Sequence, residues 1–67
     1  MENRLKETRE SIGYTQVEVA IKLGITDRHY KSLEAGESDG SMKIWQQLAK
    51  LFNCTIDYLL KQEDTKR

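Results

Sequence analysis

Proline is absent from this chain of 67 residues, which also contains only one cysteine and four glycines. The single cysteine, Cys54, cannot form an intramolecular disulfide, so the disulfide framework of small secreted domains is excluded. No apolar run approaches the roughly 18 residues that a membrane-spanning helix needs. The charged beginning, MENRLKETRE, does not have the pattern of a signal peptide. We therefore expect a cytoplasmic domain with no membrane partner.

An excess of charge of either sign is also missing, since 11 basic residues balance 11 acidic residues. Proteins that bind nucleic acids usually carry a basic excess, because phosphate contacts supply much of their affinity. Any basic surface on this protein must therefore come from the arrangement of its charges and not from their total.

The usual sets of catalytic and metal-binding residues are missing as well. The only histidine, His29, lies far in sequence from Cys54, and two such residues are too few for a zinc site. The chain has no clustered Ser/His/Asp, Cys/His or paired-carboxylate set and no glycine loop for a phosphate. We expect no metal, no small-molecule cofactor and no enzymatic activity. His29 is expected on a helix surface and Cys54 in the core.

The composition and the hydrophobic periodicity are typical of helices. Leu, Ala, Glu, Lys and Gln are common, and β-branched residues never alternate over a run. Start and stop signals predict an all-α fold with five helices, at about residues 4–12, 15–23, 26–35, 41–52 and 55–60. Asn3 is the expected N-cap of the first helix, and Thr15 to Glu18 reads as a capping box. We expect one domain over residues 1–67, with its core at 4–61 and a polar tail at 62–67.

The apolar residues at helical spacing define the expected core. They are Leu5, Ile12, Val19, Ala20, Ile21, Leu23, Ile25, Tyr30, Leu33, Ile44, Trp45, Leu48, Leu51, Phe52, Ile56, Leu59 and Leu60. Apolar residues make up 37% of the chain, so the core is thin for a fold without disulfides or metals. Some of the apolar residues at 58–60 can exceed what so small a core hides.

The second and third predicted helices are separated by a very short turn around Gly24. Two short helices joined this tightly, with a glycine in the turn, predict a helix-turn-helix. Ala20 has to be small there, because the following helix crosses close to it, and Gly24 has to adopt a positive φ. The third helix begins with polar residues, TDRH, and this edge would enter the major groove of DNA.

At this point the sequence resembles the Cro and phage-repressor type of helix-turn-helix domain, often called the Xre family. The resemblance covers residues 4 to 60 without a gap, and it implies a lambda-repressor-like fold. It is carried by Arg9, Gly13, TQ at 15–16, Ala20, LGI at 23–25, LEAG at 33–36, LA at 48–49 and IDYLL at 56–60.

The resemblance also implies roles for individual residues. Gln16 would touch a DNA phosphate and brace the recognition helix, which is expected at residues 26–35. Arg9 and Glu34 match a structural ion pair between the first and third helices of the family. The residues expected to face base edges or the backbone are Thr26, Asp27, Arg28, Lys31 and Ser32. The plain alternative for Arg28, Lys31 and Ser32 is that they belong to an ordinary solvated helix surface.

Arg28 and Asp27 have distinct expected chemistry. An arginine at the start of the recognition helix can donate two parallel hydrogen bonds to guanine O6 and N7. Asp27 repels phosphates unless it accepts a hydrogen bond from cytosine N4 or orients Arg28. We favour the second role, in which Asp27 fixes the guanidinium of Arg28. If so, Asp27→Ala broadens the sequence preference, whereas a purely repulsive Asp27 would leave selectivity unchanged and tighten binding.

One departure from the family pattern concerns the loop after the recognition helix. Family members often have Lys or Arg in this loop and a proline before the fourth helix, whereas this chain has ESDGS with Glu37 and Asp39. Lys43 is the only cation nearby, so modest affinity for a single domain and reliance on dimers are expected. The family often dimerises through its last helix, and a two-fold dimer would read an inverted repeat.

The sequence therefore predicts a bacterial, phage or mobile-element transcriptional regulator that binds operator DNA as a repressor and a homodimer. The alternative on the same fold is a protein-interaction module, such as the partner of a toxin or of another repressor. The neutral charge and the acidic loop favour this alternative.

Overall fold

The computed structural model describes residues 3–60, which contain five α-helices. They are α1 (Leu5–Ile12), α2 (Gln16–Leu23), α3 (Asp27–Ala35), α4 (Met42–Phe52) and α5 (Ile56–Leu59). No strand occurs within these residues, so the prediction of an all-α, five-helix fold is confirmed. The predicted polar tail at residues 62–67 lies outside the described range.

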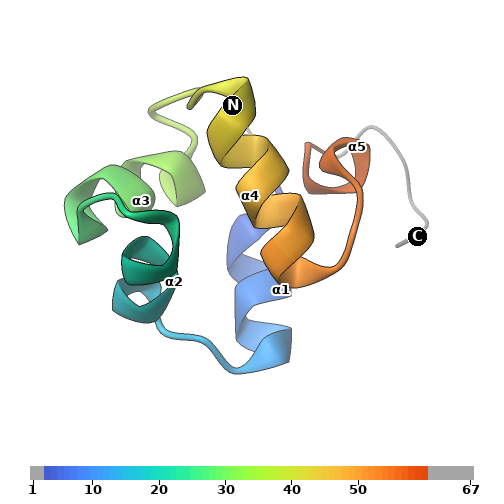
Figure 1. Ribbon diagram of the computed structural model, residues 1–67, viewed down its shortest axis with the longest axis horizontal. Coiled ribbons are helices and arrows are strands. Elements are labelled where there is room, and N and C mark those ends of the chain that lie inside the picture. The colour runs from blue at the N-terminus through green and yellow to red at the C-terminus, as the bar shows by residue number, and fades with distance from the viewer. Residues whose placement is uncertain (1–2, 61–67) are drawn as a thin grey trace.

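The helices surround one core, with α4 in the middle of the view in Figure 1. The pair α2 and α3 lies on one side of α4 along the longest axis of the molecule, and α5 lies on the other side. The core is formed by Leu5, Val19, Ala20, Leu23, Tyr30, Leu33, Trp45, Leu48, Phe52, Cys54 and Leu59. Cys54 is only 2% exposed, as expected for a small core residue.

Side-chain caps set the starts of four of these helices. The Thr15 hydroxyl accepts a hydrogen bond from the Glu18 N–H, and the Glu18 carboxylate accepts one from the Thr15 N–H at 2.8 Å, which confirms the predicted capping box. The bonds to the backbone and side chain of Thr15 lower the pKa of Glu18. Thr26, Ser41 and Thr55 cap α3, α4 and α5 in the same way, each accepting from the N–H three residues later.

The start of α1 differs from the prediction. Arg4, and not Asn3, occupies the N-cap position, and its side chain makes no capping hydrogen bond. The Asn3 side chain instead accepts from the N–H of Leu5 at 3.0 Å and donates to the carbonyl of Leu33 at 2.8 Å. Asn3 therefore satisfies one free N–H of α1 and also ties the beginning of the chain to α3.

Two residues predicted to be in the core are exposed. Ile21 is 71% exposed, because the buried stripe of α2 follows Val19, Ala20 and Leu23 and leaves Ile21 on its outer flank. Ile12 is 44% exposed, since it is the last residue of α1 before the chain turns at Gly13. Among residues 58–60, some of which were expected to exceed the core, Leu59 is completely buried.

None of the described helices is both long enough and apolar enough to cross a lipid bilayer. Within residues 3–60, no group of three or more His, Cys, Asp or Glu side chains is placed to hold a metal ion.

Candidate nucleic-acid interface

The turn between α2 and α3 is built around Gly24, which adopts φ 74° and ψ 30°. This left-handed conformation strains residues that carry a Cβ, so glycine is favoured there. The next amide, that of Ile25, donates to the carbonyl of Ala20 at 3.0 Å and closes the end of α2. Ala20 is 2% exposed and part of the core, so a larger side chain there would have to displace buried neighbours.

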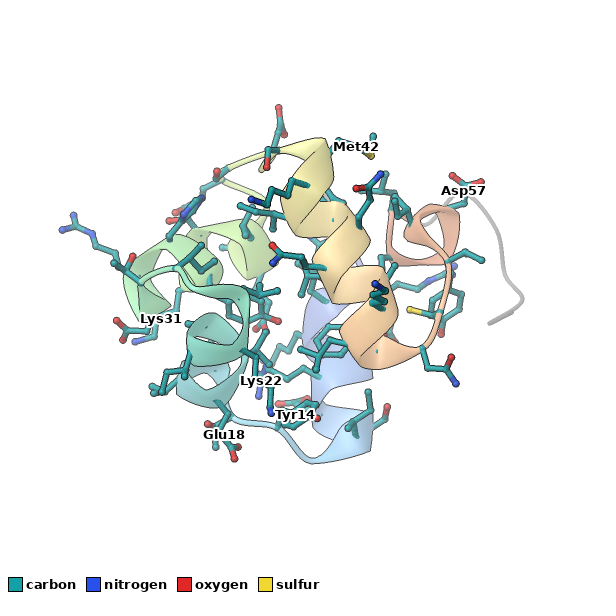
Figure 2. The ribbon with its side chains drawn as sticks, in the orientation of Figure 1. Tyr14, Glu18, Lys22, Lys31, Met42 and Asp57 are labelled. Carbon is teal, nitrogen blue, oxygen red and sulfur yellow. The ribbon has the colours of Figure 1, made fainter. Side chains whose placement is uncertain are left out.

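The two faces of α3 differ sharply in character. Tyr30 and Leu33 are completely buried and anchor the helix to the core. On the opposite face, Asp27, Arg28 and Lys31 are exposed. Figure 2 shows Lys31 at the outer edge of the molecule, on the side away from α4 and α5. Helix α3 therefore presents a polar face to solvent, on the side where the sequence predicts DNA contacts.

Of the predicted base-facing residues, Thr26 has its hydroxyl oxygen engaged within the protein, and Ser32 is less exposed than the others. Thr26 is exposed, but its hydroxyl oxygen accepts the capping bond from the His29 N–H at 3.0 Å, so its hydrogen remains as the group available to a ligand. Ser32 is half-buried, and its carbonyl accepts the N–H groups of Glu37 and Ser38 in the following loop. His29 is likewise half-buried.

Asp27 pairs with Lys31, and the structure contains no ion pair between Asp27 and Arg28. The Asp27 Oδ2 lies 3.6 Å from Lys31 Nζ, with both side chains about half exposed at 50% and 56%. The physical reason is helical spacing, because residues four apart share a face whereas adjacent residues point about 100° apart. The expected orientation of Arg28 by Asp27 is therefore not the arrangement of the free protein.

A polar network joins α1, α2 and α3 behind this exposed face. Arg9 Nε donates to Glu34 Oε2 at 2.6 Å, and the two side chains are only 10% and 5% exposed. Arg9 Nη1 also donates to the carbonyl of Tyr14 at 2.8 Å, and Gln16 Nε2 donates to Glu34 Oε1 at 3.1 Å. Gln16 is thus held against the recognition helix, with its amide oxygen and second amide hydrogen left for other partners.

The network shifts the pKa values of its members. Burial raises the pKa of Glu34, but the hydrogen bonds from Arg9 and other neighbours outweigh burial, so the pKa is below its usual 4.5. The hydrogen bond to Glu34 raises the pKa of Arg9. Burial and the nearby Glu34 raise the pKa of the Tyr30 hydroxyl, which lacks a well-formed hydrogen bond. Glu34 is therefore ionised at neutral pH and holds the three helices together.

The loop from α3 to α4 is fixed although it has no proline. Trp45 Nε1 donates to the carbonyl of Asp39 at 2.6 Å, and Gly40 adopts φ 69°. A Cβ at Gly40 would lie 2.8 Å from the buried Leu33 Cδ2, so the loop approaches α3 closely. Lys43 follows in the first turn of α4, where its side chain is exposed.

The outer face of α4 carries further polar residues that the sequence did not single out. Lys43, Gln46, Gln47 and Lys50 line a hollow of about 350 Å³. Of these, only Lys43 was predicted as a site residue. The signal was available in the sequence, since MKIWQQLAKLF places these residues at i, i+3, i+4 and i+7 and contains no acidic residue.

Two short helices joined at a left-handed glycine, with the second anchored by its inner face and polar on its outer face, define a helix-turn-helix DNA-binding protein. The comparison with known families agrees, since the helix-turn-helix family model matches residues 5–59. The chain belongs to this family, in its Xre/Cro-like form.

Named relatives of the chain carry the same description. It is 36% identical over 64 residues to the HTH-type transcriptional regulator ImmR of Bacillus subtilis (strain 168), covering 96% of this chain and 50% of ImmR. It is 38% identical over 58 residues to the SPbeta prophage-derived uncharacterised HTH-type transcriptional regulator YonR of the same strain, covering 87% of this chain and 54% of YonR. The chain thus spans about half the length of these two relatives.

An archaeal relative has a length similar to that of this chain. The uncharacterised HTH-type transcriptional regulator MJ0272 of Methanocaldococcus jannaschii is 34% identical over 64 residues, which is 96% of this chain and 97% of the relative. The similarity therefore extends over the whole fold and not only over α2 and α3.

Proposed function

We propose that this protein is a sequence-specific transcriptional regulator of the cytoplasm, which binds an operator by placing α3 in the major groove and represses by occluding the polymerase. The observation that carries the proposal is the contrast between the two faces of α3. Tyr30 and Leu33 are completely buried, whereas Arg28 and Lys31 are exposed on the opposite side. Because its inner face is anchored in the core, α3 can insert its outer face into the major groove while it stays packed in the fold.

The exposed residues divide into base-reading and backbone-binding groups. Arg28 reads guanine, because its guanidinium can donate two parallel bonds to O6 and N7, worth about 1–3 kcal/mol of discrimination. Thr26 and Ser32 donate to neighbouring base edges or phosphates through their hydroxyl groups. Gln16 binds a phosphate beside the start of α2, and the Glu34 contact at 3.1 Å holds it in place.

Lys31 and Lys43 supply the salt-dependent part of the affinity. Lys31 would leave its exposed 3.6 Å pair with Asp27 for a phosphate, and Lys43 would grip the backbone from the start of α4. Two phosphates neutralised by lysine per domain give a slope of about −2 in log K against log salt, and the neutral Gln16 contact does not add to it. The acidic residues Glu37 and Asp39, both exposed in the adjacent loop, limit the affinity on this side.

A homodimer joined at the α5 end explains how so few DNA contacts per domain can give specific binding. The recognition helix and α5 lie at opposite ends of the longest axis, which extends over 29 Å (Figure 1). Two copies joined near α5 with their long axes steeply inclined to each other, and not end to end, would place their recognition helices one DNA turn apart, about 34 Å. Such a dimer would read an inverted repeat in successive major grooves.

In vitro selection of bound duplexes from a random pool tests the proposal directly. We expect an enriched inverted repeat that contains a guanine in each half-site, with half-site centres about 10 base pairs apart. A salt titration of the selected duplex should give a slope of about −4 for the dimer. No detectable duplex binding at low salt would refute the proposal and favour a protein-interaction module, while a single enriched half-site would refute the dimer alone.

A further inference from the structure

The outer face of α4 carries a hollow that neither the core nor the recognition helix uses. It has a volume of about 350 Å³ and is lined by Lys43, Gln46, Gln47 and Lys50. This face is opposite the one that Trp45 and Leu48 bury in the core, and α4 lies nearest the viewer in Figure 1. We call these four residues the α4 groove.

Every side chain of the α4 groove is a hydrogen-bond donor, and two of them are cations. Within residues 3–60, α4 is the one helix without Asp or Glu, although the whole chain has no net charge. Neither Lys43 nor Lys50 takes part in an ion pair in this range, whereas Lys31 is paired with Asp27. The chemistry of the groove therefore favours an anionic occupant.

The length of the groove favours a protein over DNA. Lys50 lies seven residues beyond Lys43, a step of about 10.5 Å along the helix. The DNA face is marked by Lys31 at the outer edge of α3 (Figure 2), and the proposed backbone contact uses only the first turn of α4. A second helix packed alongside α4 would have the same rise per residue, so two carboxylates seven residues apart would meet both lysines.

We infer that the α4 groove binds an acidic helical segment of a protein partner, with two carboxylates facing Lys43 and Lys50 and with Gln46 and Gln47 bonding to polar groups between them. The partner would occupy a face next to the DNA-binding edge and would share Lys43 with the proposed backbone contact, so a partner and a duplex would compete for that lysine. The partner could still bind the regulator without displacing the recognition helix from the core.

The test uses synthetic helical peptides as probes and the full chain as the target. One alanine-rich peptide of about 15 residues carries two glutamates seven residues apart. A second peptide has the same composition with the two glutamates adjacent. Binding is measured from amide chemical-shift changes for the unchanged protein and for the Lys50→Glu variant. Lys6→Glu is the control, because it reverses an exposed charge on α1, away from the groove. Circular dichroism checks that the variants are folded.

We expect shifts on α4 with the first peptide and affinity about fivefold weaker for the second. The Lys50→Glu variant should bind the first peptide at least about fivefold more weakly than the unchanged protein does, whereas Lys6→Glu should bind it equally well. A peptide with lysine in place of glutamate should bind Lys50→Glu better than it binds the unchanged protein. Equal binding of both peptides, or no shift on α4, would overturn the inference.

DNA binding measured on the same samples separates this inference from the proposed function. Lys50→Glu should change duplex affinity by less than about twofold at physiological salt. If the variant instead loses duplex affinity and its salt slope falls by about one, the groove follows the DNA backbone and the inference is wrong. A protein that binds the peptide but no duplex would refute the proposed function and leave the groove as its interaction site.

Discussion

Replacing Glu34 by glutamine tests how strongly the fold depends on the Arg9–Glu34 pair. The substitution keeps the shape of the side chain and removes its charge. Arg9 would then retain its bond to the Tyr14 carbonyl but lose the 2.6 Å carboxylate contact in a site where it is only 10% exposed. Breaking a buried ion pair by removing one partner costs about 3–5 kcal/mol, and we take the lower end because the pair lies at the edge of the core.

This loss is large for so small a domain. A chain of this length is expected to be stable by roughly 3–10 kcal/mol, so a loss of about 3 kcal/mol removes a third or more of the total. Each kcal/mol shifts the unfolding temperature of such a domain by roughly 4–8 °C. Glu34→Gln should therefore lower the unfolding temperature by roughly 12–24 °C.

The pH dependence gives an independent check on the same group. The folded state holds the pKa of Glu34 below 4.5, so its stabilising effect is complete above about pH 4.5 and is lost as the pH falls through the folded pKa. The groups facing Glu34 are Arg9, Tyr30 and Gln16, and Glu10 lies 3.8 Å from Arg9 on the exposed side. The difference in stability between the unchanged protein and the variant should therefore shrink on acidification.

Urea unfolding of both proteins from pH 7 to pH 3 measures these effects. Glu37→Gln serves as a matched control, since it removes an exposed carboxylate and should change stability by less than about 0.5 kcal/mol. A double-mutant cycle with Arg9→Met isolates the pair from the single losses. The reasoning fails if Glu34→Gln costs less than about 1 kcal/mol at pH 7, or if the difference between the two proteins does not depend on pH.

Three further predictions concern the recognition helix and its supports. Arg28→Lys keeps the charge but loses the two parallel N–H donors of the guanidinium. It should therefore reduce discrimination in favour of guanine by about 1–3 kcal/mol without changing the salt slope of DNA binding. In vitro selection of duplexes with the variant checks this. Asp27→Asn frees Lys31, so specific and random duplexes should both bind about twofold tighter, and reduced selectivity would show instead that Asp27 reads or orients a base contact. Gly40→Ala should destabilise the fold by about 1–3 kcal/mol more than Gly24→Ala. Both glycines have similar φ, but only at Gly40 would the added Cβ meet a buried neighbour, Leu33 Cδ2 at 2.8 Å. Equal losses of stability in urea unfolding would contradict this.

Local signals in the sequence were sufficient to predict the helices and most of the core. The capping residues Thr15 and Thr26 and the glycine at 24 act through neighbours within a few residues, so their effects are visible in the sequence. The start of α1 was misplaced by one residue because Asn3 bonds to Leu33, a contact across 30 residues that no local pattern contains. Ile21 was misassigned because its apolar character does not reveal which flank of a short helix packs inward.

The site was less predictable than the fold, because it depends on which side chains meet. Asp27 was expected beside Arg28, its neighbour in sequence, but helical spacing places it beside Lys31. The spacing of the four α4 groove residues on a face without acidic residues is visible in the sequence, but the hollow between them is visible only in the structure. The tie between Gln16 and Glu34 joins two helices, and only the folded chain brings these residues together.

The absence of net charge constrains how this domain can achieve specific binding. In the proposed mode of binding only two lysines per domain contact phosphates, so nonspecific attraction would be weak and a larger share of the affinity would have to come from base contacts and from pairing of domains. Two linked domains gain from effective concentration, which raises the affinity for an inverted repeat far more than for a single half-site. A neutral domain that binds its sites in pairs therefore discriminates better against random DNA than a strongly basic one would. The exposed ion pair between Asp27 and Lys31 would further weaken the nonspecific attraction, because a duplex that uses this lysine would first have to compete with Asp27 for it.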